Sequence, residues 1–204
     1  STGSPVSPTN TNASAWREIE MSRLAIVLGL VLTSTVALRG DESPPVSLDS
    51  RVRVDLYAEH PQIVTPTGID VDAQGRVWVL ESNTHFPPEG YAGHATDRLL
   101  VFEGIGPDRR AQMVTTFTDG FVHAMSVVAR PNGDIFVATR KEIFVLRDDN
   151  GDSKPDGSPR RIVLLDTPGD YPHNGLAGFA FDASGRMYFG CGENLGAEYR
   201  LVGS

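Results

Sequence analysis

One pattern occurs three times along the chain, in residues 67–83 (TGIDVDAQGRVWVLESN), 124–139 (AMSVVARPNGDIFVAT) and 176–194 (LAGFAFDASGRMYFGCGEN). In each copy a small-and-apolar run leads into a tight turn that ends in glycine, at Gly75, Gly133 or Gly185. An alternating run with one aromatic residue follows. Repeats of roughly 40–50 residues with four strands each are typical of β-propeller blades. We therefore predict an all-β protein of the β-propeller class, with about two and a half blades in this sequence. Another all-β meander or sandwich is the alternative.

The expected strands follow from the alternation of apolar and polar residues between turn signals. In the first blade they are 68–72, 76–81, 98–102 and 111–117, and in the second 125–129, 134–139, 142–146 and 161–165. The third blade is expected to contain 177–182 and 186–190. A further strand at 52–57 would be the outer strand of the last blade, closing the ring. No helix is expected beyond residue 40.

Composition excludes several classes of protein. The 204 residues are 40% hydrophobic, which is too apolar for a disordered chain. The formal net charge of −8 argues against a nucleic-acid partner, which would normally meet a basic patch. The single cysteine, Cys191, excludes an internal disulfide and any metal site built from several cysteines. The 21 glycines and 14 prolines favour short strands joined by turns.

The beginning of the chain predicts export. Residues 1–20 start without methionine and are polar up to residue 15, so we expect upstream, disordered sequence there. Residues 21–40 hold Arg23 followed by the apolar run 24–38, which is typical of a secretory signal peptide. The run is shorter than the roughly 20 residues of a membrane span, although an uncleaved anchor is the alternative. Residues 41–204 would then be the N-terminal part of a propeller truncated at its C-terminus, located in the periplasm or cell envelope, with no span after the signal segment.

The order of strands predicts that the histidines gather at one end of the blades. Alternate connections of an antiparallel meander lie at the same end of the sheet. The crossings between blades would therefore share an end with the long loop 82–97. That end would receive these residues: His60, His85, His94, His123, His173, Arg140, Lys141, Glu193 and Asn194. Loops on a rigid scaffold often carry binding sites, so we predict an active face there, with His85 and Arg140 binding substrate. The alternative is that histidines simply favour loops.

The loop 148–156 has the composition of a calcium site. Asp148, Asn150, Asp152 and Asp156 offer oxygen ligands at alternate positions, with Gly151 allowing the turn. A hard cation such as Ca²⁺ takes ligands of this kind. We predict that Ca²⁺ orders the loop, on the side of the blade opposite the histidines. A solvated acidic turn is the alternative.

The stretch 171–197 carries the most specific chemistry. His173 precedes the third pair of strands, and Glu193 and Asn194 follow it, so all three are expected at the same end. Histidine suits a general base because its ordinary pKa lies near neutrality.

This stretch, with Asn83 to Pro88 (NTHFPP), Asp97 to Leu99 (DRL) and the loop 148–156, resembles the quinoprotein glucose and sorbosone dehydrogenases. It is most similar to the membrane-bound dehydrogenase propellers of large exported bacterial proteins. The resemblance covers about residues 50–200 and implies a propeller that is six-bladed when complete. It also implies that His173 takes the hydroxyl proton while hydride passes to pyrroloquinoline quinone. Glu193 and Asn194 align with positions near substrate and base, and a haem c domain would follow in the full-length protein.

The sequence departs from that family at several points. Gly-Leu-Ala-Gly stands at 175–178 where the family has Gly-Arg-Leu, and Gly192-Glu193 stands for Gly-Asp. The basic residues that hold the quinone in the family lie mostly beyond residue 204, and no CxxCH motif is present. We therefore expect either an exported sugar or alcohol dehydrogenase or a non-catalytic propeller that binds carbohydrate or protein in a larger envelope protein. A metal-dependent lactonase is the third reading, for which only Glu193, Asn194 and Asp119 offer ligands.

Overall fold

The computed structural model describes residues 45–169, 175–192 and 196–204, and these contain strands and no helix. The all-β prediction is confirmed. The predicted upstream segment 1–20 and signal segment 21–40 lie outside the described residues. Within the described stretches no helix has the length and apolar character needed to cross a membrane. Val46–Ser204 forms one contact unit, and the fold below is that of this unit.

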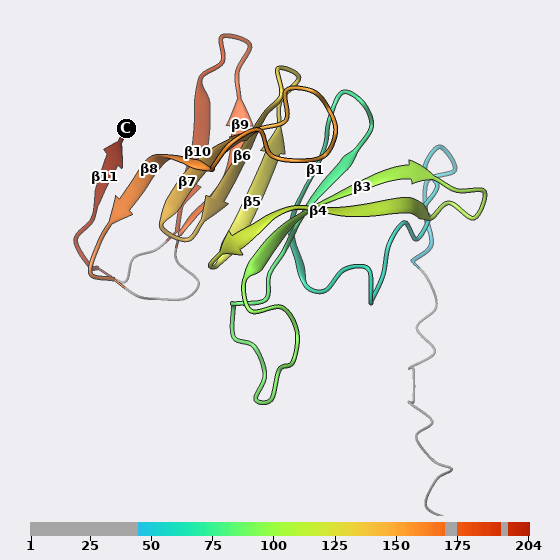
Figure 1. Ribbon diagram of the computed structural model, residues 1–204, viewed down its shortest axis with the longest axis horizontal. Helices are drawn as coiled ribbons and strands as arrows, with labels where there is room; N and C mark the ends of the chain where they lie inside the picture. The colour runs from blue at the N-terminus through green and yellow to red at the C-terminus, as the bar shows by residue number, and fades with distance from the viewer. Residues whose placement is uncertain (1–44, 170–174, 193–195) are drawn as a thin grey trace, which may run out of the picture. The chain divides into compact units, whose positions relative to one another are not determined.

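The strands form three antiparallel sheets, in which chain neighbours pair with each other (Figure 1). The first sheet contains β1 (Pro66–Val71), β2 (Val77–Glu81), β3 (Asp97–Ile105) and β4 (Ala111–Phe121). The second contains β5 (Ala124–Ala129), β6 (Asp134–Thr139), β7 (Glu142–Arg147) and β8 (Arg160–Asp166), with β11 (Arg200–Gly203) added at its edge. The third pairs β9 (Leu176–Phe181) with β10 (Met187–Cys191). Two four-stranded meanders followed by a strand pair match the predicted two and a half blades, and no closed ring of blades is seen in the described residues.

The tight turns between the first two strands of each sheet are the same structure three times. The glycine N–H donates to the carbonyl three residues earlier at 3.0 Å in each copy, from Gly75 to Asp72, Gly133 to Arg130 and Gly185 to Asp182. Each glycine has a φ between 81° and 85°. Side chains rarely adopt this left-handed conformation, which explains the glycine at each position. The repeat in the sequence is therefore a repeat of backbone conformation.

The sheets pack face to face. One apolar cluster joins Trp78, Leu99 and Phe117 of the first sheet to Val127 and Ile135 of the second. A second cluster packs β6, β7 and β8 against β9 and β10. Strands buried on both faces need apolar residues in succession rather than in alternation. The run Leu99 to Phe102 in β3 is such a strand, since all four side chains are buried.

The first strands of the three sheets lie side by side and are joined by side chains. The carboxylate of Asp70 in β1 accepts the N–H of Ala129 in β5 at 2.8 Å. Ser126 Oγ in β5 accepts the N–H of Gly178 in β9 at 2.9 Å. A Cβ on Gly68 would lie 3.1 Å from the backbone of Ser126, so β1 and β5 approach closely. These contacts hold the first strands of the three sheets against one another.

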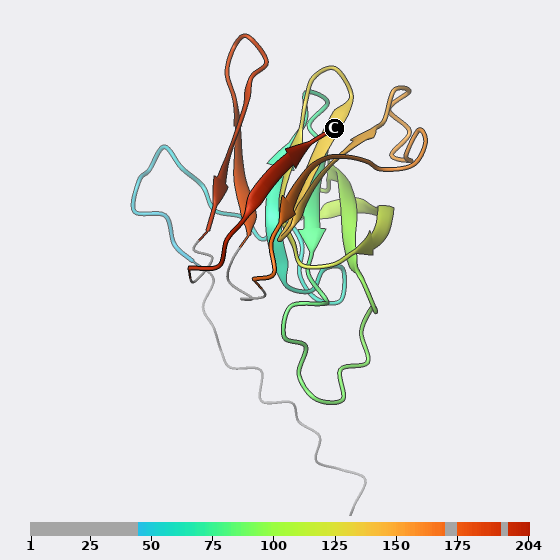
Figure 2. The same ribbon diagram turned by 90° about the vertical axis from the view of Figure 1, so that its left-hand side faces the viewer.

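The connections separate into two ends, as the meander topology predicts. Figures 1 and 2 show the tight turns of the three sheets and the loop 148–158 at the top, and the long loop between β2 and β3 at the bottom. The crossing between β4 and β5 lies at the same end as the β2–β3 loop, because Thr84 Oγ1 accepts the N–H of His123 at 2.8 Å.

Two parts of the chain differ from the predicted strands. Residues 52–57 belong to no strand, and Val52, Val54 and Leu56 are about half exposed. The segment instead attaches through Tyr57, whose carbonyl accepts the N–H of Ala111 at 2.9 Å. The strand β11 (Arg200–Gly203) was not expected, and it extends the second sheet by pairing with β8. The alternation at 52–57 is apolar enough for a strand. A strand also needs the edge of another strand to pair with, and the sequence pattern does not show whether one is there.

Candidate functional site

Two histidines meet at the end of the sheets that holds the long loop. His85 belongs to the loop between β2 and β3, and His123 belongs to the crossing between β4 and β5. Their ring centroids lie 6.0 Å apart with the planes at 87°. Both side chains are half-buried. The structure thus brings together two imidazoles that are 38 positions apart in the sequence.

Arg140 joins this pair from the turn between β6 and β7. Its backbone N–H donates to the carbonyl of His123 at 2.9 Å, and its carbonyl accepts the N–H of Leu176, where β9 begins, at 3.1 Å. A Cβ on Gly175 would lie 2.6 Å from the Arg140 Cα. Arg140 is therefore the position where the second sheet meets both the β4–β5 crossing and the start of the third sheet. We call His85, His123 and Arg140 the histidine cluster.

The electrostatics of the cluster favour a neutral imidazole at His123. Burial lowers the pKa of His123, and the positive charge of Arg140 lowers it further. The negative charge of Asp97 acts in the opposite direction but does not compensate, so the pKa lies below its ordinary value of 6.5. At neutral pH this side chain can accept a proton or a hydrogen bond.

The other predicted residues of this end have different placements. His94 makes a 3.7 Å contact from Nε2 to Asp119, and its Nδ1 lies 3.0 Å from the carbonyl of Thr96. His60 is exposed in the segment that precedes β1. The predicted base His173 and the predicted substrate residues Glu193 and Asn194 lie outside the described residues. An open hollow of about 520 Å³ lies along the long loop, lined by Asn83, Thr84, Pro87, Pro88, Tyr91 and His94 among others.

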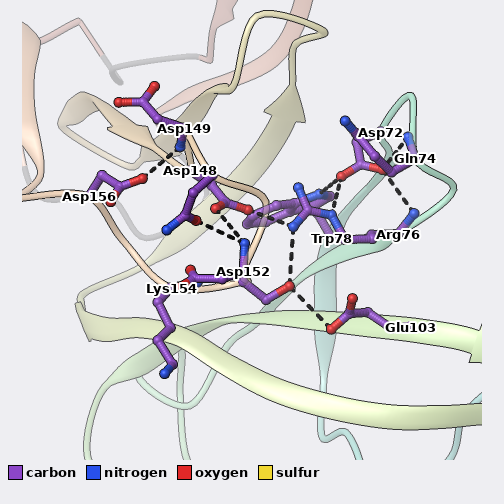
Figure 3. Close-up of polar contacts among 12 residues, drawn as sticks. Asp72, Gln74, Arg76, Trp78, Glu103, Asp148, Asp149, Asp152, Lys154 and Asp156 are labelled. Carbon is purple, nitrogen blue, oxygen red and sulfur yellow. Dashed lines mark hydrogen bonds and ion pairs between the residues drawn. The ribbon is translucent and has the colours of Figure 1, made fainter.

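The loop 148–156 is folded on its own backbone (Figure 3). Asp148 Oδ1 and Asn150 Oδ1 both accept the N–H of Asp152, at 3.1 and 3.0 Å. Asp156 Oδ2 accepts the N–H of Asp149 at 2.6 Å. In the part of the chain that the structure describes, no three His, Cys, Asp or Glu side chains are grouped to hold a metal ion. The calcium site stays a prediction.

A guanidinium from another sheet reaches this loop. Arg76, which directly precedes β2, donates to Asp148 Oδ2 at 2.6 Å and to Ser153 Oγ at 3.2 Å. Its Nε donates to Asp72 Oδ2 at 2.6 Å (Figure 3). The side chains of Asp72 and Asp148 are only 4% and 0% exposed. The first and second sheets are thus linked by a buried arginine between two carboxylates.

The sequence did not predict the roles of three residues that hold together the histidine cluster and the loop 148–156. His123 was placed at the correct end without a role, and the contributions of Asp97 and Arg76 were not foreseen. The spacing of Asp72 and Arg76 signals a local ion pair. No sequence signal relates Arg76 to Asp148, which lies 72 positions away.

Fold and site together define an all-β domain of stacked antiparallel meanders with histidines gathered at one end. Residues 43–201 match the model of a family described as a domain of unknown function (DUF7133), and the chain belongs to that family. No curated protein and no solved structure matches the chain.

Proposed function

We propose that the protein is an exported dehydrogenase of the propeller type that oxidises a hydroxyl group of a sugar or alcohol, with its histidine-bearing end as the site. The observation that carries the proposal is the histidine cluster, in which His85 and His123 lie beside Arg140 and the start of the third sheet. Gly175, against the Arg140 backbone, follows His173 by two positions in the sequence. The resemblance to quinoprotein dehydrogenases also supports a site at this end of the sheets.

Each residue of the site has a role in this chemistry. His173 takes the proton of the substrate hydroxyl as the carbon–hydrogen bond breaks. His85 and the neutral His123 hold the substrate hydroxyls, and the charge of Arg140 stabilises the negative charge that develops on the oxygen. Glu193 and Asn194 bind neighbouring hydroxyls. Pyrroloquinoline quinone, when bound, would supply the hydride acceptor that converts the substrate hydroxyl to a carbonyl. Arg140 and the imidazoles are donors that suit the carboxylates and carbonyls of such a cofactor.

The test is turnover by the protein at its natural length, supplied with pyrroloquinoline quinone and calcium. We expect aldoses or simple alcohols to reduce an electron-accepting dye, and His173→Ala to lower kcat by about 100-fold or more, the usual contribution of a general base. His60→Ala is the matched control, because this histidine is exposed in the segment before β1 and is not a member of the histidine cluster. The activity of this variant should stay within about twofold of the parent.

Absence of turnover with every substrate, or an unchanged rate in His173→Ala, contradicts the dehydrogenase proposal. Binding of an oligosaccharide or a protein without turnover supports the alternative, a non-catalytic module of a larger envelope protein. Retention of the protein in the cytoplasm when the full gene is expressed in its host contradicts export.

We further propose that Ca²⁺ binds the loop 148–156 through the oxygens of Asn150, Asp152 and Asp156, with Asp148 shared with Arg76. Millimolar calcium should raise the Tm relative to a chelator by about 2–4 °C for each kcal/mol of stabilisation in a domain of this size. Asp152→Ala should abolish the increase. Asp149→Asn, in the same loop but outside the ligand set, should retain it. Equal Tm values with calcium and with chelator contradict the proposal.

A further inference from the structure

A buried carboxylate stands behind the histidine cluster. Asp97, the first residue of β3, is completely buried. Its Oδ1 accepts the N–H groups of Asn83 and Thr84 at 2.6 and 2.8 Å. Its Oδ2 accepts the Thr84 hydroxyl at 3.0 Å and the N–H of Ala124 at 2.7 Å. A buried charge is tolerated when it is fully hydrogen-bonded, and these four donors come from the β2–β3 loop and from the first residue of β5.

The donors are the chain neighbours of the two histidines. Thr84 directly precedes His85, and Ala124 directly follows His123. The Thr84 hydroxyl, while donating to Asp97, accepts the N–H of His123 at 2.8 Å. Asp97 and Thr84 therefore fix the backbone next to both histidines. They do so although His85 lies in the β2–β3 loop and His123 lies in the β4–β5 crossing.

His123 has a backbone conformation that needs such support. Its φ is 53°, in the left-handed region that non-glycine residues seldom occupy. Conformations of this kind persist when surrounding contacts determine them, and they concentrate at functional sites. The contacts that determine this one are the hydrogen bonds from Ala124 to Asp97, from His123 to Thr84 and from Arg140 to His123.

We infer that Asp97 is the positioning residue of the proposed site, holding His85 and His123 in register through Thr84 and Ala124. This inference rests on the proposed function for its catalytic consequence, but the geometry it describes is independent of turnover. Asp97 also places a negative charge near His123, where it partly offsets the charge of Arg140. Removing that charge should therefore lower the pKa of His123 further, because the effects of Arg140 and His85, which both lower this pKa, would no longer be offset by Asp97.

The experiment compares Asp97→Asn with Glu81→Gln by NMR of the histidine rings in the protein at its natural length. Glu81 is an equally buried carboxylate at the end of β2 that accepts the Val64 N–H at 2.9 Å, pairs with Arg98 and accepts the Asn83 side-chain amide at 3.3 Å. Asp97, in contrast, accepts the backbone N–H groups of Thr84 and Ala124, the residues next to His85 and His123. In Asp97→Asn we expect the ring-to-ring contact of His85 and His123 to be lost and the titration of His123 to move to lower pH. Glu81→Gln should leave both unchanged. Under the proposed function, kcat should fall about tenfold or more in Asp97→Asn, a fraction of the roughly 10²–10⁴ that a positioned acid–base group contributes.

A second variant keeps the inference testable if Asp97→Asn does not fold. Thr84→Val removes the hydroxyl but keeps the Asp97 charge, so it should weaken the ring contact, and Thr84→Ser should restore it. An unchanged ring contact and His123 titration in Asp97→Asn, or the same changes in Glu81→Gln, would overturn the inference. If these NMR changes occur while the parent protein shows no turnover, the proposed function fails and the positioning role of Asp97 stands.

Discussion

Replacing Arg76 with methionine should lower the free energy of unfolding by about 3–5 kcal/mol, the usual cost of removing one partner from a buried ion pair. Arg76 is 11% exposed and lies between the carboxylates of Asp72 and Asp148, so methionine fills much of its volume but leaves two buried acids without a cation. Urea unfolding at pH 7 measures the change. Arg161→Met is the matched control, because Arg161 and Glu142 form an exposed pair at 2.8 Å. It should cost no more than about 1 kcal/mol, and an equal cost in the two variants contradicts the importance of the buried network.

The same variant should change how stability depends on pH. Burial raises the pKa of Asp72, but hydrogen bonds from Trp78 and Arg76 outweigh it, and the pKa lies below the ordinary value of 3.8. A carboxyl whose pKa is lower in the folded state stabilises the protein above the unfolded pKa and loses that contribution as pH falls through the folded value. The difference between the parent and Arg76→Met should therefore be largest near neutral pH and should narrow below pH 3.8. A difference that is constant between pH 7 and pH 3 contradicts this assignment.

Among glycine-to-alanine substitutions near the site, in the part of the chain that the structure describes, Gly175→Ala should lower the stability of the fold the most. The new Cβ would lie 2.6 Å from the Arg140 Cα and 2.7 Å from its carbonyl oxygen, and neither backbone atom can rotate away. The separation of the sheets that follows would strain the hydrogen bond from Leu176 to Arg140, and the displacement of Gly175 itself would strain the one from Gly192 to Gly175. We expect a loss of about 3 kcal/mol from overpacking and weakened hydrogen bonds, together with a loss of any turnover.

Gly178→Ala separates the clash from backbone strain. Gly178 has a φ of 69°, and no atom lies within 4 Å of the place where a Cβ would stand, so alanine there meets the left-handed conformation but no neighbour. Its cost should be about 1–2 kcal/mol. Thermal unfolding of both variants measures the difference, and a cost for Gly175→Ala no larger than that for Gly178→Ala contradicts the close approach of the two backbones.

The local pattern predicted the strands because each repeat carries its own turn glycine and its own apolar face. The ends of β1 to β10 follow the expected ranges closely, and β4 runs further, to Phe121. The errors concern partners. Val52, Val54 and Leu56 alternate like a strand but meet no sheet edge among the described residues. The strand β11 is explained by the free edge of β8, which no inspection of residues 200–203 reveals.

The sequence predicts where the candidate site lies but not how its side chains are arranged. Counting strands places His85 and Arg140 at one end, because alternate connections of a meander share an end. The contact between the His85 and His123 rings depends on how the loop 82–97 folds back, and that is decided by four hydrogen bonds to Asp97. Hydrogen bonds from the backbone to a buried side chain leave no pattern in a single sequence. For the same reason Arg76 was read as part of a strand and not as the partner of Asp148.

The separation of the connections into two ends affects how this protein can diversify. The tight turns and the histidine cluster are attached to opposite ends of the same rigid strands, so a change of length in one set of loops need not move the other. The loop between β2 and β3 can lengthen, shorten or exchange residues while Asp97 continues to anchor its base. Relatives with different binding preferences can therefore arise through changes in the sequence and length of this one loop, while the repeats that specify the fold stay the same.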